Sequence, residues 1–216
     1  MSSFPGSPRL IKAGIALLDP DSGALQRLIA LQYNPDTLTR TLTPKAPGET
    51  TDRSEALRLK GPPVETIKLE AEIDVVDLLD EGDGTAESAG IAPQLAALET
   101  IVYPTSAQLQ ATDAKARSGT LEIAAVISSL ALFIWGRHRV VPVRITEFSI
   151  TEEAFDPALN PIRAKVSLGM RVLTMNDLGF EHRGSSIFMA YLQAKEQLAS
   201  ASPTRRLVEL GIGRIP

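Results

Sequence analysis

The clearest pattern of hydrophobic and polar positions lies in residues 130–174. The last third of this segment alternates strictly between apolar and polar side chains. Its apolar positions are Ile162, Ala164, Val166, Leu168, Met170 and Val172. Successive side chains of a β-strand point to opposite faces, so the alternation predicts a half-buried strand with one face in the core and one in water.

The strand before it changes phase once. Val141, Val143 and Ile145 alternate in one phase, whereas Phe148 and Ile150 alternate in the opposite one. One extra residue inverts every later side chain, so the slip predicts a β-bulge or a corner of a barrel or sandwich.

A loop is expected between these two strands, over residues 151–161. It contains two Asx-Pro steps, Asp156-Pro157 and Asn160-Pro161, which break strands and favour turns. We therefore expect two long antiparallel strands joined by this loop.

Three further stretches have strand character. Residues 10–18 are apolar, run into the turn-forming DPDSGA, and are followed by Ile29, Leu31 and Tyr33 at period two, which predicts a hairpin. Residues 38–42 follow Asn34-Pro35 as a bent or extended continuation. A half-buried strand is predicted from the alternation of Ile67, Leu69, Ala71 and Ile73 with Lys68, Glu70, Glu72 and Asp74.

Helical patterns are short. Pro93 opens a helix with one apolar face, ended by Tyr103-Pro104. Residues 105–119 predict a frayed helix or a loop, and residues 119–127 an extra strand. A last helix is expected from about Ile187 to Ser200, capped by Ser185 or Ser186. Its apolar stripe is Ile187, Tyr191, Ala194 and Leu198.

The remaining segments predict loops and termini. Residues 1–8 form a mobile arm, residues 44–63 a long exposed loop, and residues 78–90 a solvated acidic loop. Residues 205–216 contain several apolar side chains. Such a segment docks on its own domain or, in an assembly, covers a neighbour.

Composition and charge limit the class of protein. The hydrophobic content of 44% suits one ordinary core. A net charge of −4 with no Lys or Arg block argues against nucleic acid and anionic membranes. The longest apolar stretch, residues 123–135, is short of the roughly 20 residues of a membrane span and predicts a core strand. We expect no secretory signal and folding in the cytoplasm.

Candidate chemistry is sparse. The chain has no Cys, and its two histidines, His138 and His182, lie in predicted loops without zinc-ligand spacing. The acidic residues Asp80, Glu81 and Asp83 do not have EF-hand spacing. The carboxylates of Glu152 and Glu153 could act in acid–base chemistry only inside a cleft. We therefore predict no catalytic residues, no cofactor site and no metal site, and hence no enzyme.

Four ordered blocks together resemble one family. These blocks are QYNPDTLTR, ETIKLEAEID, FIWG and PVRITEFSITEEAFDPALNPIRAKVSL. The chain resembles the tube-type proteins of contractile injection systems, which are phage-tail-like particles. The resemblance implies a mainly β fold with short helices, that is a tube-protein-like β-barrel or sandwich with a flanking helix and a C-terminal helix. The domain boundaries we expect are an arm over 1–9, the β-barrel domain over 10–176, and a C-terminal helix and tail over 177–216.

The resemblance also implies a role. We expect a hexameric ring on the central axis that joins the spike or baseplate hub to the inner tube, either as tube initiator or as hub adaptor. Its partners would be its own copies, the inner tube protein, the spike or hub protein and other baseplate proteins, with no nucleic acid and no direct membrane insertion. The ring would assemble in the bacterial cytoplasm and then belong to the particle, with residues 44–63 reaching a neighbouring subunit or ring.

Two points limit this expectation. Many relatives that adapt the tube to the spike carry a C-terminal LysM module, for which the residues after the predicted last helix leave no room, and this departure argues against the LysM-type adaptor role. The alternative function is a solitary β-domain that binds a peptide or another ligand on its sheet. A native mass that is a multiple of 23.2 kDa would favour the ring.

Overall fold

A computed structural model of the chain describes residues 11–46, 58–76, 84–117 and 128–203, together with Leu79, Gly82, Glu209, Ile212 and Arg214. Seven strands form one antiparallel sheet in the order β2-β1-β5-β6-β7-β4-β3. The strands are β1 (Gly14–Leu18), β2 (Leu25–Ala30), β3 (Leu38–Thr43), β4 (Val64–Asp74), β5 (Leu130–Ile134), β6 (Val140–Phe155) and β7 (Pro161–Val172). The helices are α2 (Gly84–Ala89), α3 (Ala92–Glu99), α4 (Ser106–Arg117), α5 (Met175–Leu178) and α6 (Arg183–Ser200). The predicted mainly β fold with a flanking and a C-terminal helix is confirmed.

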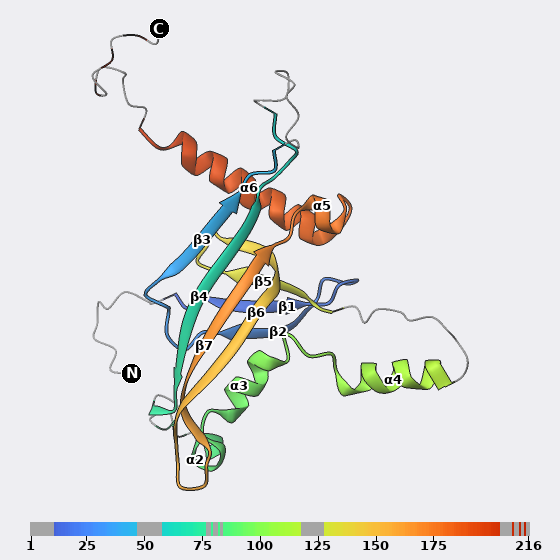
Figure 1. Ribbon diagram of the computed structural model, residues 1–216, viewed down its shortest axis with the longest axis vertical. Helices are drawn as coiled ribbons and strands as arrows, with labels where there is room; N and C mark the ends of the chain where they lie inside the picture. The colour runs from blue at the N-terminus through green and yellow to red at the C-terminus, as the bar shows by residue number, and fades with distance from the viewer. Residues whose placement is uncertain are drawn as a thin grey trace.

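The sheet is curled rather than flat. In Figure 1 the strands β1, β2 and β5 cross the strands β3, β4 and β7 at a steep angle. Buried side chains of both parts, such as Ile15, Phe133, Ile67 and Val166, belong to one core cluster. The curl brings the end of β2 close to the end of β4, where the side-chain amide of Gln32 forms two hydrogen bonds with the backbone of Asp74.

The predicted alternation of β7 and β4 is confirmed. Val166 and Met170 are 0% exposed on β7, as is Ile67 on β4, whereas the polar positions between them reach the surface. The predicted bulge is also present, because the register of β6 against β7 shifts between Ile145 and Glu147.

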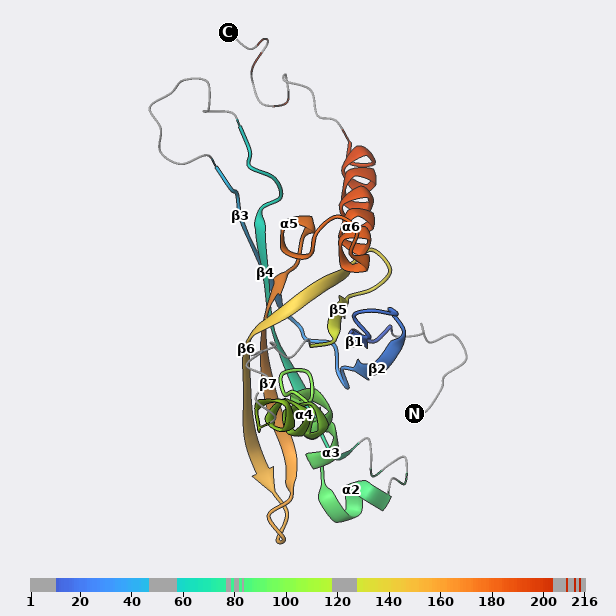
Figure 2. The ribbon, with the colours of Figure 1, turned by 90° about the vertical axis from the view of Figure 1, so that its right-hand side faces the viewer.

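The connection between β6 and β7 is shorter than predicted. Residues 151–155, expected in the loop, are part of β6 and pair with the start of β7, with Thr151 opposite Lys165. Only residues 156–160 turn. The Asp156 carboxylate accepts hydrogen bonds from the backbone amides of Ala158 and Asn160, which closes the turn at the first Asx-Pro step. The hairpin therefore extends well beyond the rest of the sheet (Figure 2).

The N-terminal stretches follow their predictions with one refinement. Strands β1 and β2 form the expected hairpin. Residues 38–43 are a strand of their own, β3, which pairs with β4 at the opposite edge of the sheet. Hydrogen bonding with β4 explains why this short, mostly exposed segment is extended.

The predicted start and cap of α6 are wrong, and its predicted apolar stripe is confirmed only in part. The helix begins at Arg183, and its cap is His182, whose Nδ1 accepts a hydrogen bond from the Gly184 amide. Ser185 is instead buried, and its hydroxyl donates to the Gly179 carbonyl. Of the predicted stripe, Tyr191 is buried together with Phe188 and Ile187 packs against a core cluster, whereas Leu198 is 53% exposed.

Other local predictions are partly corrected. Helix α2 lies inside the segment predicted as an acidic loop, and its Ala86 is buried in the core. The predicted helix after Pro93 is α3, which ends at Glu99, before the expected Tyr103-Pro104. Residues 106–117 are helical, as α4, without a buried side chain. Of the core strand predicted over residues 123–135, residues 130–134 form β5, and residues 123–127 lie outside the described residues. The predicted arm, the strand over 119–127, Asp80, Glu81, Asp83, and much of the 44–63 loop and the C-terminal tail lie outside the described residues.

Candidate functional site: the outer face of the long strands

A polar surface runs across the strands β4, β6 and β7 on the side away from the core, and is here called the outer face. It consists of Lys68, Glu70, Glu72 and Asp74 of β4, Arg163, Lys165 and Ser167 of β7, and Glu147, Ser149, Thr151 and Glu153 of β6. In β4 and β7 the residues before and after each apolar core residue point to this face, because side chains alternate along a strand. The register sets cross-strand rows, such as Glu72, Lys165 and Thr151.

Opposite charges on the outer face are paired across strands. Lys68 Nζ lies 2.7 Å from Glu147 Oε2, Arg163 Nε 2.8 Å from Asp74 Oδ2, and Lys165 Nζ 3.0 Å from Glu153 Oε1. Lys68 reaches Glu147 over Gly169, whose missing side chain leaves that space open. Exposed ion pairs of this kind contribute only about 0–1 kcal/mol each to the free energy of unfolding. Their main effect is a surface that carries both positive and negative side chains at fixed positions.

The ionisation of the outer face follows from these pairs. Burial raises the pKa of Asp74, but hydrogen bonds from the Val76 amide and Arg163 outweigh it, so that the pKa lies below its ordinary value. The hydrogen bond and charge of Glu153 raise the pKa of Lys165 above its ordinary value. Both groups therefore stay charged at neutral pH, and the face stays hydrated.

A second polar cluster lies beneath α6. The Glu65 side chain is 4% exposed and accepts hydrogen bonds from Arg40 of β3, and from Tyr191 and Lys195 of α6. The Lys195 ammonium also lies 4.1 Å from the centre of the Tyr191 ring. Burial raises the pKa of Glu65, but the hydrogen bonds and charges of Lys195 and Arg40 outweigh burial, so the pKa lies below its ordinary value.

This cluster joins the C-terminal helix to the edge of the sheet. Glu65 was not among the residues singled out from the sequence, although the alternation that continues back from Ile67 places Glu65 on the core side of β4. Its partners are separated from it by 25, 126 and 130 residues, so no local pattern points to them. The arrangement is an ion-pair anchor, because every polar atom of Glu65 is directed at a cation or a hydroxyl.

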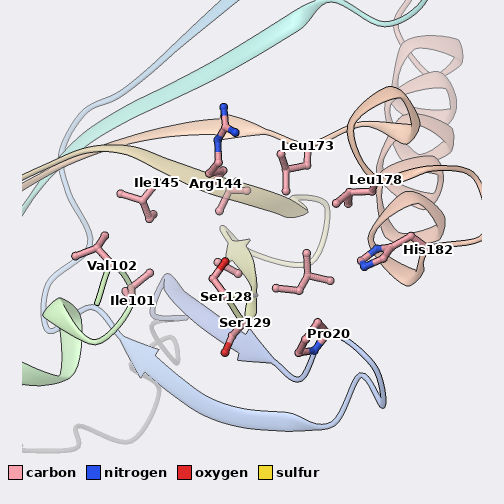
Figure 3. A pocket seen from close by; sticks show the side chains of 13 residues that line it. Pro20, Ile101, Val102, Ser128, Ser129, Arg144, Ile145, Leu173, Leu178 and His182 are labelled. Carbon is pink, nitrogen blue, oxygen red and sulfur yellow. The ribbon is translucent and has the colours of Figure 1, made fainter. Parts of the chain in front are cut away.

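A cleft of about 570 Å³ lies between the two parts of the sheet and the start of α6. Figure 3 shows Ser128, Ser129, Arg144 and His182 around it, among mostly apolar neighbours. The Arg144 side chain points away from the two serines. His182 Nδ1 is already an acceptor for the helix cap. The cleft therefore does not present a serine and a histidine base as a working pair.

The candidate residues from the sequence are dispersed. His138 is exposed in the turn between β5 and β6, and His182 caps α6. Glu152 and Glu153 lie near the C-terminal end of β6, and Glu153 forms an ion pair with Lys165. Within the described residues, no three His, Cys, Asp or Glu side chains are grouped so that they could hold a metal ion.

Comparisons of the sequence with models of known protein families and with curated proteins give no match. Of the helices that the structure describes, none combines the length and the apolar character needed to cross a membrane.

Proposed function

We propose that the chain is a structural component of a contractile injection system, a phage-tail-like particle, and forms a ring on the central axis between the spike or baseplate hub and the inner tube. The observation that carries this proposal is the outer face. Three long, adjacent strands present a polar wall with mixed charge, on which three cross-strand ion pairs join acidic and basic groups.

Such a wall has the properties that a lumen needs. A lumen that passes other molecules has to remain wet and must not offer apolar patches on which they would stick. Lys68, Glu70 and Glu72 are alternate, exposed positions of β4, and we place them at the lumen of the proposed ring. The opposite face of the same strands is packed with apolar side chains and so faces away from the lumen.

A ring also requires two different, complementary contact surfaces on each subunit, because its contacts are heterologous. The sheet ends in two different edges, β2 on one side and β3 on the other. The proposed partners are further copies in a hexamer, the inner tube protein, the spike or hub protein and other baseplate proteins. The subunit would assemble in the bacterial cytoplasm, become part of the particle, and act without catalysis.

Thiol accessibility tests the ring, because the chain has no Cys of its own. Glu70→Cys places a thiol on the outer face, and Glu196→Cys places one on an exposed position of α6. Both should react with a bulky maleimide in the free subunit. In assembled particles the thiol at position 70 should lose most of its reactivity, because the bulky reagent can reach an enclosed lumen only through the ends of the tube.

Deletion of the gene gives the matching genetic test. Loss of the chain should yield particles in which spike and tube are not joined, or no particles. Intact contractile particles after deletion, a location on the outer sheath, or a position-70 thiol that reacts equally in subunit and particle would each contradict the proposal.

A further inference from the structure

A groove of about 460 Å³ opens between two strand edges at the curled end of the sheet. Residues 27–32 of β2 and its continuation line one side, and residues 71–73 of β4 line the other. Gln94, Ala97 and Leu98 of α3 close the third side. Its volume lies within the roughly 300–1,000 Å³ typical of ligand sites.

Both edges lack a strand partner within the described residues. Strand β2 pairs with β1 alone. Strand β3 covers β4 only as far as Leu69, which leaves residues 70–74 uncovered on that side. At one end of the gap, Gln32 Nε2 donates to the Asp74 carbonyl at 2.8 Å, and the Asp74 amide donates to Gln32 Oε1 at 2.9 Å. A side-chain amide thus takes the place that a strand backbone would occupy.

The backbone directions on both edges fit a missing strand. The Leu31 amide donates to Ala13 of the β1 side, so the amides and carbonyls of Leu28 and Ala30, at the alternate positions, point to the groove. The Asp74 amide points to Gln32, so the backbone groups of Glu72, two residues earlier, point the same way. An extended segment in the groove would hydrogen-bond to both edges.

The lining specifies the side chains of that segment. Leu28, Ile29, Leu31, Ile73 and Leu98 make most of the wall apolar. The buried Oε1 atom of Gln94 has no hydrogen-bond donor in the described part of the chain and would accept one from a backbone amide. Lys12 and Arg27 outnumber Glu72 among the charged lining residues. An extended segment with alternating apolar residues and a carboxylate fits this lining.

The C-terminal segment of the chain has this composition. In residues 203–216, Val208, Leu210 and Ile212 alternate with Glu209 and Gly211. Helix α6, from which the segment continues, and α3, which closes the groove, lie in opposite halves of the molecule (Figures 1 and 2). We propose that the groove receives residues 203–216 of a second copy of the chain as an additional β-strand. The proposal does not rest on a role in a contractile particle.

Disulfide trapping between full-length variants tests this proposal. Leu28→Cys puts a thiol on the β2 edge of the groove, and Leu210→Cys puts one in the inserted strand. When the two single variants are mixed and mildly oxidised, we expect a disulfide-linked dimer of twice 23.2 kDa. Leu42→Cys, on the exposed β3 edge, is the matched control and should give little dimer with Leu210→Cys.

Two substitutions on α3 separate the groove from general effects. Ala97 lines the groove and Ala96 beside it is exposed. Ala97→Phe fills the groove and should lower the yield of linked dimer by about tenfold, whereas Ala96→Phe should leave it unchanged. Equal circular dichroism and melting of the two variants shows that the loss is local.

The proposal would be overturned by the absence of a linked dimer, by as much dimer with Leu42→Cys as with Leu28→Cys, or by equal yields for Ala97→Phe and Ala96→Phe. A chain that carries both cysteines and links only within itself would place the segment in its own groove, which also contradicts a second copy. A linked dimer in a protein that proves absent from any particle would leave this inference intact and remove only the proposed function.

Discussion

Glu65 is a carboxylate held in a buried position by Arg40, Tyr191 and Lys195. Its pKa is lower in the folded chain than its ordinary value of 4.5, so its stabilising effect is complete above that pH and is lost as the pH falls through the folded pKa. At neutral pH, Glu65→Gln should lower the free energy of unfolding by about 2–3 kcal/mol, because two cations lose their counter-charge. Urea unfolding measures the loss.

The pH dependence of this variant separates charge from packing. As the pH falls below 4.5, the ordinary pKa of a glutamate, the unfolding free energy of the wild type should fall more steeply than that of Glu65→Gln, since only the wild type loses the anion. Glu70→Gln, on the exposed side of the same strand, should change stability by no more than about 0.5 kcal/mol. Parallel pH profiles of the wild type and Glu65→Gln would show that the ion-pair anchor does not contribute.

Adjacent residues of β7 give the sharpest contrast between the two faces of the sheet. Val166 is 0% exposed, so Val166→Asp buries an unpaired charge at a cost of several kcal/mol and should abolish soluble folding. Lys165→Asp loses the pair with Glu153 on the outer face and should cost about 1 kcal/mol while the chain still folds. Soluble yield and thermal melting distinguish these outcomes. Similar behaviour of the two variants would refute the register.

At the scale of elements, the corner between α2 and α3 is fitted tightly to the start of β7. Gly90 has a φ of +58°, and the next amide, of Ile91, donates to the Pro161 carbonyl at 2.8 Å. A Cβ atom at position 90 would collide with that same carbonyl oxygen. The close approach fixes α3, and with it the third side of the groove, against the sheet.

Two glycine substitutions test this corner. Gly136 has a φ of +70° but open space around its Cβ position. Gly136→Ala should therefore cost only the roughly 1–2 kcal/mol of left-handed backbone, whereas Gly90→Ala should cost about 3 kcal/mol or more, because the corner has to move. Chemical unfolding compares the two. Equal losses would mean that the corner yields easily.

At the scale of the whole molecule, stability rests on a large core cluster shared by the curled sheet, α2, α3 and α6 and on a smaller cluster between β1 and β5. A chelator should consequently leave the melting temperature unchanged, since the described residues bring no ligand set together. Melting with and without EDTA checks this expectation. A shift of several degrees that calcium reverses would contradict it and would point to ligands elsewhere in the chain.

The sequence alone determined the strands whose two faces differ in polarity. In β4 and β7 the polarity of each side chain indicates whether it faces the core or the solvent, because the alternation of side chains is a local property of extended backbone. The bulge near Ile145 was visible for the same reason, as a break in that period. The start of α6 was not, because the capping atom is a histidine nitrogen rather than a serine oxygen.

Only the tertiary structure decided which strands meet and what lies between them. The pairing of β1 with β5 joins segments more than a hundred residues apart, and it depends on the free energy of the whole core rather than on either segment. The partners of Glu65 belong to β3 and α6, and they too are brought to it by the packing of the whole core. The groove exists because β3 is shorter than β4 and pairs with it only as far as Leu69, which leaves the rest of that edge of β4 open. The open edge lines a groove because the curled sheet brings it close to β2 and α3.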